Sequence, residues 1–124
     1  MNAPTYLALG DSYTIGEAVP EAGRWPLQLA RHLGWSAPKI VAQTGWTTDE
    51  LSRAMDAAEL ASTHDHVSLA IGVNNQYRGR TVANYAAEFR VLLDRAIVLA
   101  GANARRVFVV SIPDWGVTPF AARD

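Results

Sequence analysis

The sequence predicts an α/β fold in which one parallel sheet lies between helices, and two observations lead to this prediction. Short apolar runs that end at glycine or proline alternate along the chain with longer segments whose apolar residues recur every three or four positions. The first pattern is typical of buried strands and the second of amphipathic helices. Because strands and helices alternate, we expect a parallel sheet with helices on both faces.

The composition is that of an ordinary globular protein, and we expect a single domain over residues 1–124. The chain is 49% hydrophobic and 19% charged, and it contains no repeats or low-complexity tracts. Its formal net charge of -1 excludes a strong field that would attract nucleic acid or an anionic membrane, so we expect neither as a partner. With no cysteine, disulfides and thiolate metal sites are excluded as well.

The first strand and the first helix have clear boundaries. Residues 5–9 form a short apolar run that Gly10 closes, which is typical of a buried strand leading into a turn. Residues 25–33 are predicted to form a short amphipathic helix. Pro26 lies near its start and Gly34 just after its end, the positions that these residues favour in helices.

A second strand and a second helix follow. Residues 39–42 are expected to form a brief strand. Thr47 and Glu50 are spaced as in a capping box, in which the two residues satisfy free N–H groups at a helix start. Apolar residues then repeat on one helical face, at Leu51, Ala54, Met55 and Ala58.

The second half of the chain is predicted to contain two more strands around a long helix. Residues 66–71 form an apolar run that ends at Gly72, and residues 107–112 form a β-branched and aromatic run that Pro113 stops. Thr81 is placed to cap the helix between them. Its apolar stripe, which we expect to face the core, consists of Val82, Tyr85, Ala86, Phe89, Leu92, Leu93, Ala96 and Leu99.

The loops that follow the predicted strands carry the residues suited to chemistry. In open parallel sheets these loops meet at one edge, where ligands bind. A serine at a strand-to-turn junction presents its hydroxyl to solvent, which makes Ser12 a candidate nucleophile. The N–H groups of Ser12 and Gly45 and the side-chain amide of Asn74 are candidate donors to an oxyanion. The four loops are Gly10-Asp11-Ser12, Thr44-Gly45-Trp46, Gly72-Val73-Asn74-Asn75 and Pro113-Asp114-Trp115-Gly116.

The first three of these loops, in this order and spacing, resemble the first three conserved blocks of the SGNH or GDSL hydrolase superfamily. The resemblance implies a flavodoxin-like three-layer α/β/α sandwich with strand order 2-1-3-4 and a fifth strand. It also implies a serine hydrolase of acyl esters, of esterase or lipase type. Ser12 would be the nucleophile, and Gly45 and Asn74 would complete the oxyanion hole. Asp11 and Asn75 would support the loops through hydrogen bonds, although the family usually has Asp where this chain has Asn75.

The same resemblance implies a catalytic Asp and His in an Asp-x-x-His block after the fifth strand, and residues 1–124 do not include that block. His64 and His66 lie at the amino end of the third predicted strand, which spans roughly 20 Å. His32 lies late in a helix. A catalytic base must come within about 3 Å of the nucleophile or act through one water, so none of these histidines fits.

We therefore expect the sequence to be the N-terminal, C-terminally truncated portion of a longer hydrolase, inactive or very slow by itself. Without the fifth strand, residues 107–112 would form an exposed apolar edge that favours self-association or binding of a C-terminal fragment. Residues 1–5 contain no basic segment of a signal peptide, which favours a cytoplasmic location.

Three aromatic residues follow predicted strands and are candidates to line a substrate pocket, although ordinary packing would explain each equally well: Trp46, Tyr77 and Trp115. We expect a small acyl ester as the substrate, no cofactor and no metal. His64 and His66 form only a weak candidate pair for a metal, because no further ligand accompanies them.

Two other functions fit parts of the sequence. In a flavodoxin-like FMN-binding protein, residues 12–16 would form the phosphate loop. However, Asp11 and Glu17 would repel the phosphate, and this function leaves Asn74 unexplained. In a non-catalytic remnant of the hydrolase fold, the crevice would still bind ligands after loss of the base.

Overall fold

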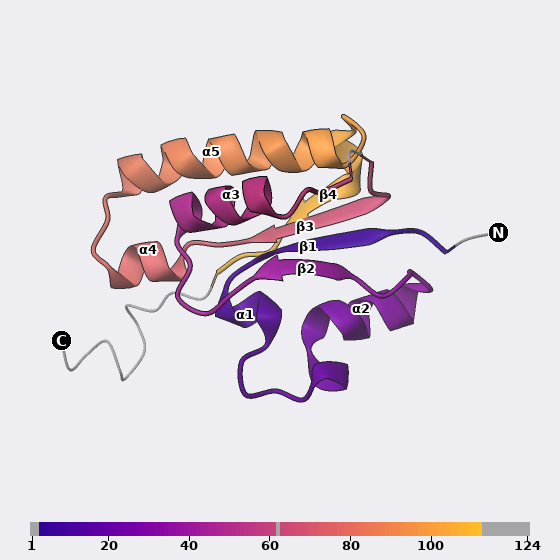
Figure 1. Ribbon diagram of the computed structural model, residues 1–124. Helices are drawn as coiled ribbons and strands as arrows, with labels where there is room; N and C mark the ends of the chain where they lie inside the picture. Colours follow the sequence, from indigo (N-terminus) through magenta and orange to yellow (C-terminus); the bar gives the residue numbers. More distant parts are fainter. Residues whose placement is uncertain (1–2, 62, 113–124) are drawn as a thin grey trace.

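A computed structural model describes residues 3–61 and 63–112, which form a four-stranded parallel sheet between two layers of helices (Figure 1). The strands lie in the order β2-β1-β3-β4, and every pair of neighbours is parallel. The fold class and the strand order 2-1-3-4 are therefore confirmed. The strands are β1 (Tyr6–Gly10), β2 (Lys39–Ala42), β3 (His66–Ala70) and β4 (Val107–Val109).

Five α-helices and two 3-10 turns connect the strands within the described residues. Helices α3 and α5 lie on one side of the sheet, and α1 and α2 lie on the other (Figure 1). The three helices with an amphipathic pattern were predicted; α4 was not, because its five residues contain no apolar repeat. The helices are α1 (Ser12–Ile15), α2 (Trp25–Leu33), α3 (Thr48–Ala57), α4 (Val73–Tyr77) and α5 (Val82–Leu99), and the turns are η1 (Glu21–Gly23) and η2 (Ala104–Arg106).

The core divides into one part on each face of the sheet because successive strand residues point to opposite faces. On the side of α3 and α5, Leu7, Leu9, Val67 and Leu69 are completely buried among residues of the two helices. On the side of α2, Tyr6 and Ala8 pack with residues of that helix and its neighbours. Burying an aliphatic or aromatic side chain contributes about 1.5–3 kcal/mol, so the strands β1 and β3 are the most strongly held part of the fold.

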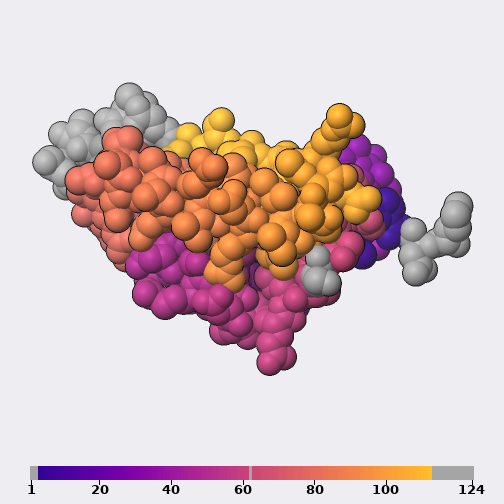
Figure 2. Space-filling view, turned by 90° about the horizontal axis from the view of Figure 1, so that it is seen from above, coloured from indigo at the N-terminus to yellow at the C-terminus, as the bar shows by residue number. Residues whose placement is uncertain are grey.

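Helix α5 does not bury the whole stripe that the sequence indicates. Leu92 and Ala96 are completely buried, whereas Val82 is 81% exposed and Ala86 is exposed too. The reason is length: a helix of 18 residues extends about 27 Å, and the strand β3 of five residues extends only about 17 Å. The first turns of α5 therefore extend beyond the sheet. Figure 2 shows α5 lying across the molecule above α3.

Strand β4 is shorter than predicted. It ends at Val109 rather than at residue 112, although the N–H of Val110 still donates to the carbonyl oxygen of Leu69 at 3.0 Å. It pairs only with β3 among the described residues and so forms an edge of the sheet, where Val109 is 51% exposed. No helix within residues 3–61 and 63–112 is long and apolar enough to cross a membrane.

Candidate functional site

Three of the candidate loops begin side by side at the carboxyl edge of the sheet. Gly10, at the end of the central strand β1, is in register with Ala42 of β2 on one side and with Ala70 of β3 on the other. Neighbouring strands lie about 4.8 Å apart. The loops carrying Ser12, Gly45 and Asn74 therefore leave the sheet from adjacent positions, and α1 and α4 lie at this edge (Figure 1).

Ser12 is the first residue of α1 and is half-buried. Asp11 caps the helix: its Oδ1 accepts the N–H of Tyr13 at 3.0 Å. Gly16, with φ 75°, ends it and donates its N–H to the carbonyl oxygen of Ser12 at 2.9 Å. Among the described residues, nothing hydrogen-bonds to the Ser12 Oγ or takes its N–H. The tight turn thus holds the serine in place, while its Oγ and N–H have no partner among the described residues.

Gly10 precedes this turn and has no room for a side chain. A Cβ at this position would lie 2.1 Å from Thr14 Oγ1 and 2.8 Å from the carbonyl oxygen of Ala70. The second contact is with the backbone of β3, which cannot rotate away. A glycine is needed here for α1 to turn back closely against the ends of the strands.

Asp11 is only 1% exposed, and this burial raises the pKa of its carboxyl group. Its Oδ2 has no hydrogen-bond partner among the described residues. Burial also raises the pKa of Tyr85, and the charge of Asp11 adds to that effect. Tyr85 donates its O–H to the carbonyl oxygen of Ile71 at 2.8 Å, at the end of β3. It therefore links α5 to the loop that carries Asn74.

The loop with Gly45 is bonded to α4. The Asn74 Nδ2 donates to the carbonyl oxygen of Trp46 at 2.9 Å, and the Arg78 Nη2 donates to the carbonyl oxygen of Gly45 at 2.7 Å. A side-chain amide has two N–H groups, so one N–H of Asn74 remains for another acceptor. Gly45 itself has φ 88°, a conformation that glycine adopts without strain. Gly45 and Asn74 were predicted from the sequence, whereas the bond from Arg78 to this loop was not.

Asn75 performs a different task from its neighbour. It is completely buried, its Oδ1 accepts the N–H of Thr48 at 3.2 Å, and its Nδ2 donates to Thr48 Oγ1 at 2.8 Å. The Thr48 hydroxyl in turn donates to Glu88 Oε1 at 2.6 Å. Asn75 thereby joins α4 to the first turn of α3, where the predicted capping box of Thr47 and Glu50 is present.

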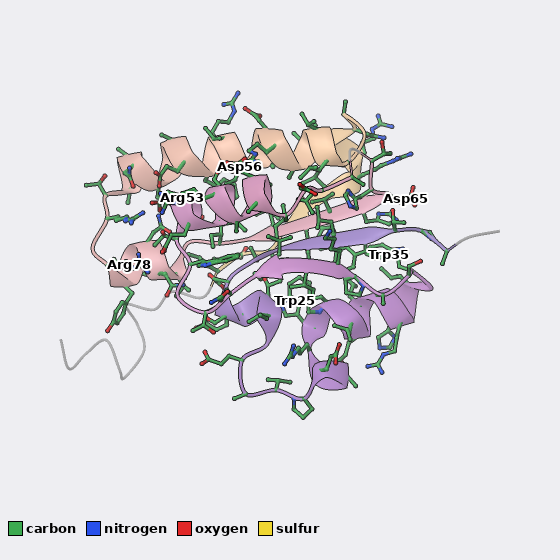
Figure 3. All side chains as sticks on the ribbon, in the orientation of Figure 1. Trp25, Trp35, Arg53, Asp56, Asp65 and Arg78 are labelled. Carbon is green, nitrogen blue, oxygen red and sulfur yellow. The ribbon has the colours of Figure 1, made fainter. Side chains whose placement is uncertain are left out.

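The three histidines of the sequence lie away from this edge. His66 is in register with Tyr6, four residues before Gly10 along β1, a separation of about 13 Å. Its ring stacks on Trp35 at 3.9 Å, and burial lowers its pKa. His64, just before β3, is buried with Nδ1 3.0 Å from the Leu99 carbonyl oxygen, and His32 is exposed near the end of α2. Figure 3 shows Trp35 and Arg78 at opposite ends of the molecule.

The structure describes two of the three predicted pocket residues, Trp46 and Tyr77. Trp46 is half-buried and packs against the core, whereas Tyr77 on α4 is 56% exposed. Trp115 lies outside the described residues. Within the described part of the chain, no group of three or more His, Cys, Asp or Glu side chains is arranged to hold a metal ion.

Residues 8–124 match the model of the GDSL-like lipase/acylhydrolase family. No curated protein matches the sequence significantly. The match includes every residue that the sequence reasoning placed in the candidate site, from Gly10 to Trp115.

Several solved structures share the fold. AlinE4, an SGNH-hydrolase family esterase, is 18% identical with a TM-score of 0.67, over 90% of this chain and 59% of that one. The psychrotrophic esterase EstA from Pseudoalteromonas sp. is 17% identical with a TM-score of 0.65, over 92% of this chain and 64% of that one. TesA is 21% identical with a TM-score of 0.67, over 90% and 62%. The chain thus spans less than two thirds of each of these structures.

Proposed function

This chain belongs to the GDSL-like lipase/acylhydrolase family, and from that premise we propose that it carries the nucleophile and the oxyanion hole of a serine esterase. One observation carries the proposal. Ser12 follows the strand β1, and the strands on either side of β1 lead into the loops that carry Gly45 and Asn74. The Ser12 hydroxyl has no hydrogen-bond partner among the described residues. Nucleophilic acyl transfer requires this combination of a reactive hydroxyl and nearby fixed donors.

The proposed reaction proceeds through an acyl-enzyme. The Ser12 Oγ attacks the carbonyl carbon of the ester, its proton passes to a general base, and the carbonyl oxygen becomes an oxyanion. The N–H groups of Ser12 and Gly45 and the second N–H of the Asn74 amide stabilise that oxyanion. When the tetrahedral intermediate collapses, the protonated base gives its proton to the leaving oxygen, and the alcohol departs. The same base then takes a proton from water, which attacks the acyl group, and returns that proton to the Ser12 oxygen as the acid is released.

The general base of this mechanism is proposed to be a histidine, oriented by an Asp, from outside residues 1–124. All three histidines of the chain lie away from the carboxyl edge, and a base must come within about 3 Å of the Ser12 hydroxyl or act through one water. The family membership favours this reaction over flavin binding. The buried carboxyl group of Asp11 also adjoins the loop that would have to hold the flavin phosphate.

Covalent labelling tests the proposal most directly. We expect an alkyl fluorophosphonate to form one adduct with the full-length protein, by which we mean a chain that includes the proposed His and Asp. The adduct should lie on the peptide that contains Ser12, because the phosphonyl oxygen occupies the place of the oxyanion. Peptide mass spectrometry locates the adduct. An adduct on another serine would contradict the assignment of Ser12. Reversible phosphonate binding without an adduct would instead favour a non-catalytic ligand-binding protein.

We also propose that chains of residues 1–124 self-associate through the β4 edge. An unpaired apolar edge strand is a template for pairing with another chain, and Val109 exposes half of its surface there. Sedimentation velocity is expected to show dimers or larger species, and Val109→Lys, which places a charge on the edge, is expected to return the protein to the monomer. A monomer at all concentrations for the unsubstituted chain would contradict this proposal.

A further inference from the structure

We propose that Arg78 is a positioning residue that holds the Gly45 loop in the geometry needed to bind the oxyanion. This inference rests on the proposed function, because it assigns a task at the same site. It starts from the spacing of two residues, Asn74 on α4 and Arg78, which caps the end of this helix. Asn74 and Arg78 are four positions apart and so project from the same face of the helix. They donate to two consecutive carbonyl groups, those of Trp46 and Gly45, at 2.9 and 2.7 Å.

Gly45 has open space on the side where other residues carry a side chain. A Cβ added at this residue would meet no atom within 4 Å, the two chain neighbours left aside. Within the described part of the chain, the backbone hydrogen bond that closes the turn runs from the N–H of Trp46 to the carbonyl oxygen of Gln43 at 3.3 Å, a long separation for such a bond. Asn74 and Arg78 thus hold the two peptide groups that directly follow the Gly45 N–H, and through them they restrict how the loop presents that N–H.

Arg78 is itself held by α3. Its Nη1 lies 3.0 Å from Glu50 Oε1, the same oxygen that accepts the N–H of Thr47 in the capping box. A guanidinium group can bond two acceptors in a fixed plane, which an ammonium group cannot. Arg78 thus connects the start of α3, the Gly45 loop and α4. Because Glu50 neutralises its charge, we assign Arg78 to geometry and not to direct attraction of the oxyanion.

Arg80 provides a matched control. It lies two residues further along the chain and pairs with Asp49, also in the first turn of α3, at 2.5 Å and with Glu88 at 3.9 Å. It has no bond to the loop of residues 43–46. Arg78→Ala removes one ion pair to the first turn of α3, and Arg80→Ala removes two, one to the same turn and one to Glu88. All of these pairs are partly open to solvent, and ion pairs near the surface contribute little to stability. Only the first substitution releases the carbonyl oxygen of Gly45.

The experiment compares Arg78→Ala, Arg78→Lys and Arg80→Ala in the full-length protein. Hydrogen exchange and amide chemical shifts report on the loop without any need for activity. In Arg78→Ala we expect the amide shifts of Gly45 and Trp46 to change. The Trp46 N–H, which donates to the carbonyl oxygen of Gln43, should exchange at least about tenfold faster, because the loop opens locally. Arg78→Lys is expected to recover only part of this protection, and Arg80→Ala should leave these amides unchanged.

Kinetics supply the second measurement. In Arg78→Ala we expect kcat for a p-nitrophenyl ester to fall by about 10- to 100-fold with KM nearly unchanged, because the misplaced donor matters only after the oxyanion forms. Arg80→Ala should stay within about twofold of the unsubstituted protein. Equal effects of Arg78→Ala and Arg80→Ala on the loop amides and on kcat would overturn the inference. The bond from Arg78 to the Gly45 carbonyl oxygen would then have no effect beyond that of an ordinary ion pair.

The two levels of the proposal fail in different ways. If hydrolysis does not depend on Ser12, the proposed function is wrong, and the amide measurements still decide whether Arg78 holds the loop. If hydrolysis depends on Ser12 but Arg78→Ala behaves like Arg80→Ala, only the task assigned to Arg78 is wrong.

Discussion

Ser12→Ala is expected to lower kcat of the full-length protein for p-nitrophenyl acetate by roughly 10⁴- to 10⁶-fold, with a much smaller change in KM. The substitution removes the attacking oxygen, whereas the backbone N–H of residue 12 and the other oxyanion donors remain. Some rate above the uncatalysed reaction should therefore persist. The fold should not change, because the Ser12 hydroxyl bonds to none of the described residues.

The matched control is Ser111→Ala, which changes an exposed serine just after β4. It should leave kcat unchanged, and circular dichroism should give the same melting temperature for both variants as for the unsubstituted protein. The same Ser12→Ala protein should also fail to react with the fluorophosphonate. If it hydrolyses the ester at an undiminished rate, the nucleophile is elsewhere and the proposed mechanism is wrong.

Asn75→Asp is expected to destabilise the protein by about 1–2 kcal/mol at neutral pH, although the family usually has Asp at this place. The Asn75 Nδ2 is a donor to Thr48 Oγ1, and the Thr48 hydrogen is already given to Glu88. A carboxylate oxygen in place of Nδ2 would face that hydroxyl with no hydrogen between them. The start of α3 favours a negative charge by about 0.3–1 kcal/mol, less than the ~1–3 kcal/mol cost of an unsatisfied buried acceptor.

The substitution Glu88→Gln tests whether the stability loss of Asn75→Asp arises from this hydrogen-bond chain. A glutamine at residue 88 can donate to Thr48 Oγ1, so that the Thr48 hydroxyl is free to donate to an aspartate at residue 75. Urea denaturation should show that Glu88→Gln restores most of the stability that Asn75→Asp loses, while it has little effect alone. The deficit should also shrink at acid pH, because a protonated carboxyl group becomes a donor. Equal losses with and without Glu88→Gln would contradict the role assigned to this hydrogen-bond chain.

The sequence predicted the parts of the fold whose causes are local. The bounds of α2 and α5 follow from Gly34 and Thr81 at their ends, and the capping box of Thr47 and Glu50 marks the start of α3. The strand order was predicted because three short segments resemble conserved blocks of the SGNH or GDSL hydrolase superfamily. The parallel sheet was predicted because strands and helices alternate along the chain. Ser12, Gly45 and Asn74 as a catalytic set stay a prediction, although the structure starts their loops at adjacent positions.

Other features depend on contacts between residues that are far apart in the chain. The periodicity of apolar residues does not predict such contacts. Helix α4 has no repeat of its own and is held by bonds to α3 and to the Gly45 loop. Val82 follows the apolar pattern of α5 but is exposed, because the helix is longer than the sheet it covers. The substrate-pocket role of Trp46 stays a prediction, and its packing against the core became visible only in three dimensions.

By itself, then, the sequence determined the fold class, the family and the candidate nucleophile, because caps, apolar periods and short motifs are encoded by neighbouring residues. Only the tertiary structure decided that Asn75 supports α3 while Asn74 turns to the loop, and that Arg78 reaches Gly45 across 33 positions. These assignments arise where side chains from separate elements meet. The packing of the sheet and helices brings the loops together and so decides which acceptor each hydrogen-bond donor reaches.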